Sequence, residues 1–172
     1  NQYTDLGSHV IPALTADGVA RAYDFSKNVI PGQDERDMGY WRDVGSLDSY
    51  YDAHMDLVSI HPVFNLYNYD WPIYTSYGPY PPAKFVHGHH GRFGEALNSA
   101  VSPGAVISGA RVNGSVISPD VHVHSYTEID ASVILDGVQI GRHCRISKTI
   151  IDKNVTIPDG TSIGYDKAKD VA

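Results

Sequence analysis

Three side chains in the first part of the chain, Asp5, Trp41 and Asp43, have functional groups that could line a binding site. A carboxylate can hold a divalent cation, and an indole can pack against the apolar face of a ligand. Each also has a structural explanation: Asp5 can cap a short helix, Trp41 is a typical core aromatic, and Asp43 ends a strand before a helix. The residues alone therefore favour structural roles, and a catalytic role needs a further argument.

The histidines and the single cysteine, Cys144, are the remaining candidates for chemistry. His87, His89 and His90 lie among glycines without a neighbouring cysteine, which favours a solvated loop over a metal site. Cys144 falls in a row of small residues, so we expect it to be buried packing rather than a nucleophile. A single cysteine excludes an intrachain disulfide and is typical of a reducing compartment, so we expect a cytoplasmic protein.

The charge and hydropathy of the chain argue against two classes of partner. The net charge is −7, from 13 basic and 20 acidic residues, and no basic stripe is visible that could follow a phosphate backbone. No apolar run approaches the length of a membrane span, and we expect no signal peptide. We therefore expect neither nucleic acid nor a membrane among the partners.

The elements that position these side chains follow from a seventeen-residue repeat in the second half of the chain. Large β-branched residues recur there in steps of six, six and five, and a fixed period of this kind is the signature of a repeat architecture. Sorting by seventeen gives three rows: Ile117, Ile134 and Ile151; Val106, Val123, Ile140 and Ile157; and Val112, Ile129, Ile146 and Ile163.

A second set of rows lies two residues earlier, and residues two apart on a strand face the same side. Each short strand therefore directs two side chains inward, and three such strands close one triangular coil. Asp120, Gly137 and Asn154 form a further row of residue types that tolerate positive φ at a corner. The second set of inward rows comprises Ser115, Ser132 and Thr149; Val121, Val138 and Val155; and Thr127, Cys144 and Thr161.

These rows predict a left-handed parallel β-helix of hexapeptide repeats, with about four coils over residues 98–167. The spacing matches neither the 3.6 nor the 3.5 period of helices. An antiparallel barrel would not place the same residue classes at a fixed long period. The repeat does not reveal the hand, which we assign because such coils resemble the left-handed β-helix family.

The residues before the repeat predict a mixture of helices and strands. We expect a helix over residues 5–15, a strand over 19–25 and a second strand over 40–44. A further helix begins after Ser46, which is a good N-cap, and ends near Val58. These elements are too few to bury a sound core of their own.

We therefore divide the chain into three parts. Residues 1–64 are interpreted as the closing part of a larger α/β domain whose earlier residues lie outside this chain. Residues 65–97 are rich in Tyr, Pro and Asn and predict an extended, packed connector. Residues 98–167 form the β-helix domain.

Several strings of residues carry a resemblance to a known family. Residues 40–47 are YWRDVGSL, and residues 51–57 continue the same helix as YDAHMDL. The strings WPIYT at 71–75 and PPAKFV at 81–86 follow in the order that the family has them. Together with the coils, they resemble bacterial ADP-glucose pyrophosphorylase, also called glucose-1-phosphate adenylyltransferase, over nearly the whole chain.

The resemblance implies a nucleotidyltransferase that makes ADP-glucose and pyrophosphate from ATP and glucose 1-phosphate in bacterial glycogen synthesis. The family uses Mg²⁺, held by two aspartates, to offset charge at the α-phosphate of ATP. Asp43 matches one of these aspartates as a catalytic metal ligand. Asp5 and Trp41 match residues of the glucose-phosphate pocket, although Leu6 replaces the family's usual Phe.

The same resemblance indicates what this chain lacks. The family's Gly-rich nucleotide loop, with its Arg and Lys, and its sugar-phosphate Lys have no counterpart in residues 1–172. We therefore identify the front half as the closing part of an α/β nucleotidyltransferase domain, and we expect the chain alone to be inactive.

Regulation is the second implication of the resemblance. Family members respond to glycolytic sugar phosphates or related metabolites at a site between the catalytic domain and the β-helix, and they are homotetramers. Lys153 matches a basic position used there, at a coil corner where a cation can project toward a phosphate. Arg142 is the next candidate, followed by Arg145 and Lys148. Solvated surface charge is the alternative explanation for all four.

Two functions from other classes remain open. Many hexapeptide-repeat proteins are acyltransferases, and His122, His124 or His143 could serve as the catalytic histidine of such an enzyme. The chain could also be a structural module that only mediates oligomerisation. The strings at 40–47 and 81–86 have no place in the acyltransferase hypothesis.

Overall fold

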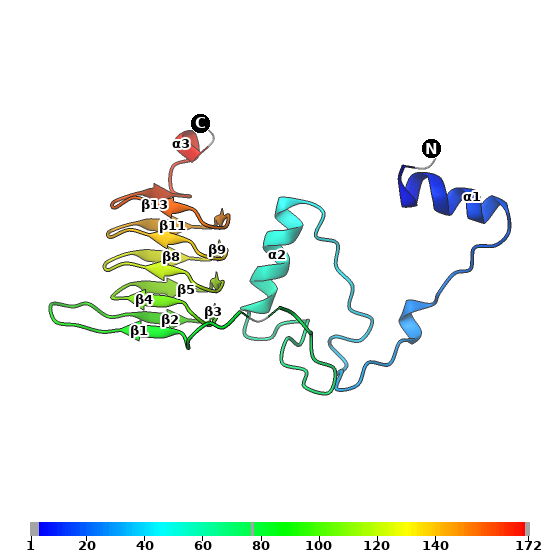
Figure 1. Ribbon diagram of the computed structural model, residues 1–172, viewed down its shortest axis with the longest axis horizontal. Helices are drawn as coiled ribbons and strands as arrows, with labels where there is room; N and C mark the ends of the chain where they lie inside the picture. The colour runs from blue at the N-terminus through cyan, green and yellow to red at the C-terminus, as the bar shows by residue number, and fades with distance from the viewer. Residues whose placement is uncertain (1–3, 77, 171–172) are drawn as a thin grey trace.

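The computed structural model describes residues 4–76 and 78–170 and contains a parallel β-helix of three sheets (Figure 1). Each coil contributes one strand to each sheet, so β1 to β12 form four coils and β13 and β14 begin a fifth. The predicted parallel β-helix of about four coils is therefore confirmed. The sheets are, in order, β1 (Lys84–Val86), β4 (Val106–Ser108), β7 (His122–Val123), β10 (Gln139–Ile140) and β13 (Thr156–Ile157); β2 (Glu95–Leu97), β5 (Arg111–Asn113), β8 (Glu128–Asp130), β11 (Arg145–Ser147) and β14 (Ser162–Ile163); and β3 (Ala100–Val101), β6 (Val116–Ile117), β9 (Val133–Ile134) and β12 (Ile150–Ile151).

The strand register reproduces most of the predicted rows. Ile134 pairs with Ile117 on one side and with Ile151 on the other, at the predicted spacing. The other rows stack in the same way from β7 and β5 onward. Burial of each Ile or Val side chain contributes about 1.5–3 kcal/mol. The largest side chains with relative exposure below 2% are Ile107, Ile117, Ile129, Ile134, Ile140, Ile146, Val112, Val121, Val123, Val133, Val138 and Thr127.

The prediction that Val106 belongs to an inward row is wrong. The residue that pairs with Val123 is Ile107, which is fully buried, whereas Val106 is half-buried and faces outward. The corner between Ile107 and Val112 is one residue shorter than the matching corners of the later coils. Gly109 turns that corner with φ 62, and a Cβ there would come within 3.1 Å of Arg92 Cβ, so the tight turn requires glycine.

The three corners of each coil are turned by residues in the left-handed conformation. The predicted corner row is confirmed, because Asp120, Gly137 and Asn154 have φ values of 60, 70 and 58. At this corner the N–H of Gly137 donates to Pro119 and that of Asn154 to Asp136, each one coil away. These bonds satisfy backbone groups that no strand pairs. Left-handed residues that the sequence did not predict turn the other two corners: Tyr126 and His143 at one, and Ala131 and Lys148 at the other.

The row of small polar residues forms a hydrogen-bond ladder inside one corner. Ser115 Oγ accepts from Ser132 N at 3.0 Å, and Ser132 Oγ accepts from Thr149 N at 3.3 Å. Each hydroxyl also donates to the carbonyl two residues earlier, at 2.8 Å. Apolar residues could not pair these buried amides, so the ladder explains why this row is polar.

The first coil begins at Lys84, earlier than the boundary predicted at residue 98. Strands β1 and β2 both pair with the second coil, so part of the predicted connector 65–97 belongs to the β-helix. A loop between Val86 and Gly94 interrupts this coil and hides the seventeen-residue period. Gly94 closes the loop, and a Cβ there would lie 2.3 Å from Ile107 O and 2.8 Å from Val86 O.

The front of the chain contains helices and extended segments. Its helical elements are η1 (Leu6–Val10), α1 (Ile11–Ala16), η2 (Phe25–Lys27) and α2 (Leu47–Leu57), and a last helix, α3 (Lys167–Asp170), follows the β-helix. The strands predicted at 19–25 and 40–44 are absent from the described residues. A strand needs a neighbour to pair its backbone, and the described part of the chain places none beside these segments. The predicted helices and the Asp5 and Ser46 caps are confirmed.

Candidate functional site

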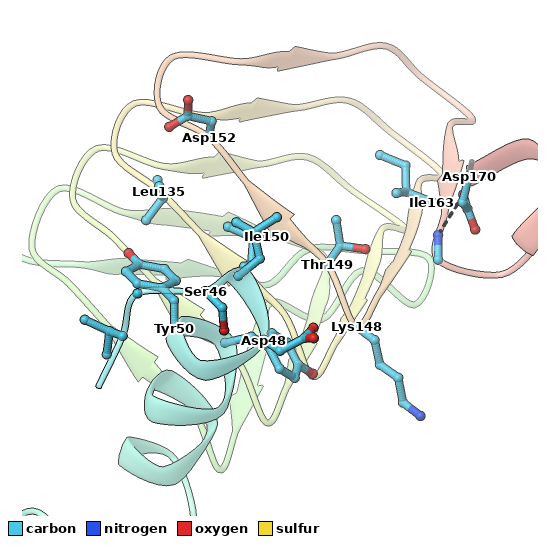
Figure 2. Close-up of a pocket in the computed structure, with 15 residues that line it drawn as sticks. Ser46, Asp48, Tyr50, Leu135, Lys148, Thr149, Ile150, Asp152, Ile163 and Asp170 are labelled. Atoms are coloured by element: carbon cyan, nitrogen blue, oxygen red, sulfur yellow. Dashed lines mark hydrogen bonds between the residues drawn. The ribbon is translucent and has the colours of Figure 1, made fainter. Parts of the chain in front are cut away.

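A cavity of about 980 Å³ lies between the start of helix α2 and the β-helix (Figure 2). The turn that runs from Val44 to Asp48 forms one wall together with Tyr50 and Tyr51. Ile150 projects from β12 toward α2 on the opposite wall (Figure 2). The remaining lining residues are Leu135, Lys148, Thr149, Asp152, Ile163, Gly164 and Asp170.

The turn before α2 holds the predicted metal ligand. Asp43 Oδ1 accepts a hydrogen bond from Gly45 N at 3.0 Å, which fixes the carboxylate above the turn. Ser46 and Ser49 then form a capping box, since each side chain accepts from the other's backbone N–H at 3.1 Å. The Asp43–Gly45 hydrogen bond and the capping box therefore hold the backbone between Asp43 and the first turn of α2.

Asp43 is suited to be one ligand of a divalent cation. Its side chain is exposed, and within the described ranges no donor other than Gly45 N binds it, so Oδ2 remains available. The described residues contain no cluster of three or more His, Cys, Asp or Glu side chains that could hold a metal. Mg²⁺ is commonly bound through one or two carboxylates, substrate phosphates and water. Asp43 therefore fits as a partial site.

The other two predicted pocket residues do not join Asp43 as a group. Trp41 lies two residues before it and is 73% exposed, so it is not a core aromatic of the described chain. Asp5 is the N-cap of η1, which leads into α1, and α1 lies apart from α2 (Figure 1). Hydrogen bonds from the Ser8 side chain and backbone lower the pKa of Asp5, as expected for a helix cap.

The two predicted effector cations lie at different corners of the β-helix. Lys153 is exposed on the corner between β12 and β13, and its N–H donates to Asp152 Oδ1 at 2.7 Å. Arg142 is exposed on the corner between β10 and β11, where its N–H donates to Asp159 Oδ1 at 2.7 Å. Among the described residues, the cation that lines the cavity is Lys148, which the sequence ranked lower. Its left-handed corner brings it opposite α2, and sequence spacing does not reveal that placement.

The histidines form ring contacts rather than a metal cluster within the described residues. His122 and His124 flank the fully buried Val123, and their rings stack at 4.3 Å between centroids. Burial, and then the charge of His124, lower the pKa of His122. His143 stacks on Tyr126 at 4.9 Å.

The predicted exposure of the histidine loop and the predicted burial of the cysteine are confirmed. His87, His89 and His90 are exposed on the loop between β1 and β2. Cys144 is fully buried in the core, where it occupies the row of small residues. Neither feature contributes to the cavity beside α2.

Residues 81–172 match the family described as GlmU-like, C-terminal hexapeptide. The chain belongs to this family. It is also similar, over 98% of its length, to proteins named glucose-1-phosphate adenylyltransferase. The identity is 53% over 169 residues with the protein of Parafrankia sp. (strain EAN1pec) and 49% over 168 residues with that of Bifidobacterium longum (strain DJO10A).

These relatives are longer than the chain. It spans 41% of the Parafrankia and Bifidobacterium proteins and matches their C-terminal part. The protein of Deinococcus radiodurans is 51% identical over 167 residues, and the chain covers 40% of it. The similarity includes the front segment as well as the β-helix that the family model covers. Among the described residues, no helix is both long and apolar enough to cross a membrane.

Proposed function

We propose that the chain is the C-terminal part of a glucose-1-phosphate adenylyltransferase, which makes ADP-glucose and pyrophosphate from ATP and glucose 1-phosphate for glycogen synthesis. The observation that carries the proposal is the identity of about half over 98% of the chain with proteins of that name. That span includes the turn with Asp43 and the coils. A β-helix alone would support many unrelated functions.

In this proposal the front segment supplies part of the substrate and metal site. Asp43 contributes one carboxylate to Mg²⁺, which offsets negative charge at the phosphate that reacts. Gly45 N holds that carboxylate in place before the substrates bind. Trp41, exposed two residues away, packs against the sugar. Asp5 stays a predicted acceptor for the sugar hydroxyls, although the structure places it at the start of η1, away from Asp43. The nucleotide loop lies in the part that the relatives have in addition.

A chimera tests the proposal. The N-terminal part of the Parafrankia enzyme is joined to this chain at the start of the matched segment. At 53% identity over 169 residues, the interface between the two parts should be retained. The chimera should form ADP-glucose and release pyrophosphate only with both ATP and glucose 1-phosphate present, at a rate within about tenfold of the natural enzyme.

The two separate parts are the controls. This chain alone should make no ADP-glucose, because it lacks the nucleotide loop. A folded chimera without activity would contradict the proposal, and so would robust turnover by the chain alone. Light scattering on the chimera measures its assembly, which we propose to be a homotetramer in the cytoplasm.

We also propose that the β-helix corner at Lys153 binds an anionic effector such as a sugar phosphate. The lysine is exposed and lies next to Asp152, which lines the cavity beside the Asp43 turn. In the chimera, Lys153→Ala should raise the effector concentration for half-maximal activation about tenfold, as expected for the loss of one charged contact. Arg142→Ala tests the second candidate in the same way.

Lys27→Ala is the matched control for Lys153, because Lys27 is an exposed lysine on the front segment, where it pairs with Asp24 at 3.0 Å. It should leave the activation curve unchanged. An unchanged curve for Lys153→Ala would remove Lys153 from the effector site.

A further inference from the structure

A single long-range hydrogen bond joins helix α2 to the β-helix within the described residues. Tyr51 Oη donates to the carbonyl of Ala131 at 2.6 Å, across a separation of 80 residues. The bond is partly buried at the edge of the cavity that Tyr51 lines. Burial, followed by the charges of Asp130 and Asp52, raises the pKa of Tyr51, so its phenol remains a donor at neutral pH.

The acceptor is part of a rigid corner. Ala131 has φ 43, and its N–H donates to the carbonyl of Asn113 in the coil below at 3.0 Å. Asp130, next to it, accepts from the side chain of Asn113 at 2.7 Å. Ser132, on the other side, is fully buried in the hydroxyl ladder. The carbonyl of Ala131 is therefore fixed by contacts on both sides.

The donor is connected to Asp43 through a short path. Arg42, next to Asp43, donates from Nη1 to the carbonyl of Asp52 at 3.3 Å, and Asp52 follows Tyr51 on α2. The capping box at Ser46 ties the turn to the start of the same helix. A helix moves as a unit, so a fixed point at Tyr51 restrains the turn that carries Asp43.

We infer that Tyr51 is a positioning residue, through which the β-helix holds α2 and the turn of Asp43 in place. The effect of Tyr51 on catalysis rests on the proposed function. The restraint of α2 by the β-helix does not depend on that proposal. It assigns the β-helix a direct role in the metal site: the corner at Ala131 is the support against which Asp43 is oriented.

Hydrogen exchange measures the restraint without any assay of activity. Tyr51→Phe in the chimera keeps the ring and removes the donor. Tyr50→Phe is the matched control on the same helix, since Tyr50 also lines the cavity but its hydroxyl bonds to no group among the described residues. Backbone amides of residues 43–49 should exchange about 3- to 10-fold faster in Tyr51→Phe and unchanged in Tyr50→Phe.

The catalytic consequence is read from the Mg²⁺ concentration at half-maximal rate. Tyr51→Phe should raise it several-fold while the KM for glucose 1-phosphate stays unchanged, because only the orientation of Asp43 is loosened. Exchange equal to that of Tyr50→Phe would overturn the inference, and so would faster exchange with an unchanged Mg²⁺ requirement. If the parent chimera is inactive, the proposed function fails, and the exchange experiment alone decides whether Tyr51 restrains the turn.

Discussion

Asp43 is the residue on which the proposed metal site depends. Its Oδ1 is held by Gly45 N, and its Oδ2 has no donor among the described residues. That arrangement serves a capped turn and a metal ligand equally well. The string YWRDVGSL favoured the second role through family resemblance, since an isolated Asp before a helix is usually structural.

The pair of stacked histidines gives a prediction for pH. His122 has a lowered pKa in the folded chain, so below about pH 6.5 the unfolded chain binds more protons than the folded one. Stability should therefore fall as the pH falls through that range. His122→Gln should flatten the fall, measured as the melting temperature between about pH 7.5 and about pH 5.

His89→Gln is the control, because His89 is exposed on the loop between β1 and β2. It should follow the parent curve at every pH. If His122→Gln and His89→Gln lose equal stability on acidification, the stacked pair has no part in the pH response.

At the scale of elements, the sequence predicts the inward-facing rows and the one corner whose residue types tolerate positive φ, and it misses the other two corners. The inward rows are visible because burial demands β-branched residues at a fixed period. The corners at Tyr126, His143, Ala131 and Lys148 are not visible, because these residue types rarely adopt positive φ and do so here under the restraint of stacked coils.

The sequence did not predict the first coil, because its backbone departs from the seventeen-residue period. Its loop between Val86 and Gly94 breaks the period, so no row extends into β1 and β2. The strands at 19–25 and 40–44 show the opposite error, since the sequence predicted them and the described residues do not form them. Alternation suits a strand, but only a neighbouring strand can pair its backbone, and the described chain contains none there.

Gly94 tests the closure of that first coil. A Cβ at this position would lie within 3.0 Å of the backbone of Val86 and Ile107, which cannot move without separating β1 from β4. Gly94→Ala should therefore destabilise the chain by about 2–4 kcal/mol, measured by urea denaturation.

Gly91→Ala is the matched control in the same loop. Gly91 has φ 74, and a Cβ there would meet no atom within 4 Å, so only the cost of positive φ remains, about 1 kcal/mol. Equal losses for the two variants would show that β1 and β4 separate without cost and that the coil does not begin at Lys84.

At the scale of the whole molecule, two segments of different character meet at one cavity. The β-helix has its own core and regular corners, whereas the front segment exposes large apolar side chains, such as Tyr23 at 77% and Val29 at 90%. An exposed apolar surface of this kind is typical of an interface. It agrees with a proposal in which the front segment completes a larger catalytic domain.

The most direct test of this account is the turnover of the chimera with Asp43→Asn, compared with Asp52→Asn. The substitution keeps the shape of Asp43 and its hydrogen bond from Gly45, but it removes the charge that binds Mg²⁺. The account predicts that kcat falls about 100-fold or more and that the Mg²⁺ requirement rises. Asp52→Asn, an exposed neighbour on α2, should retain the parent rate. Full activity of Asp43→Asn at the parent Mg²⁺ requirement would contradict the account.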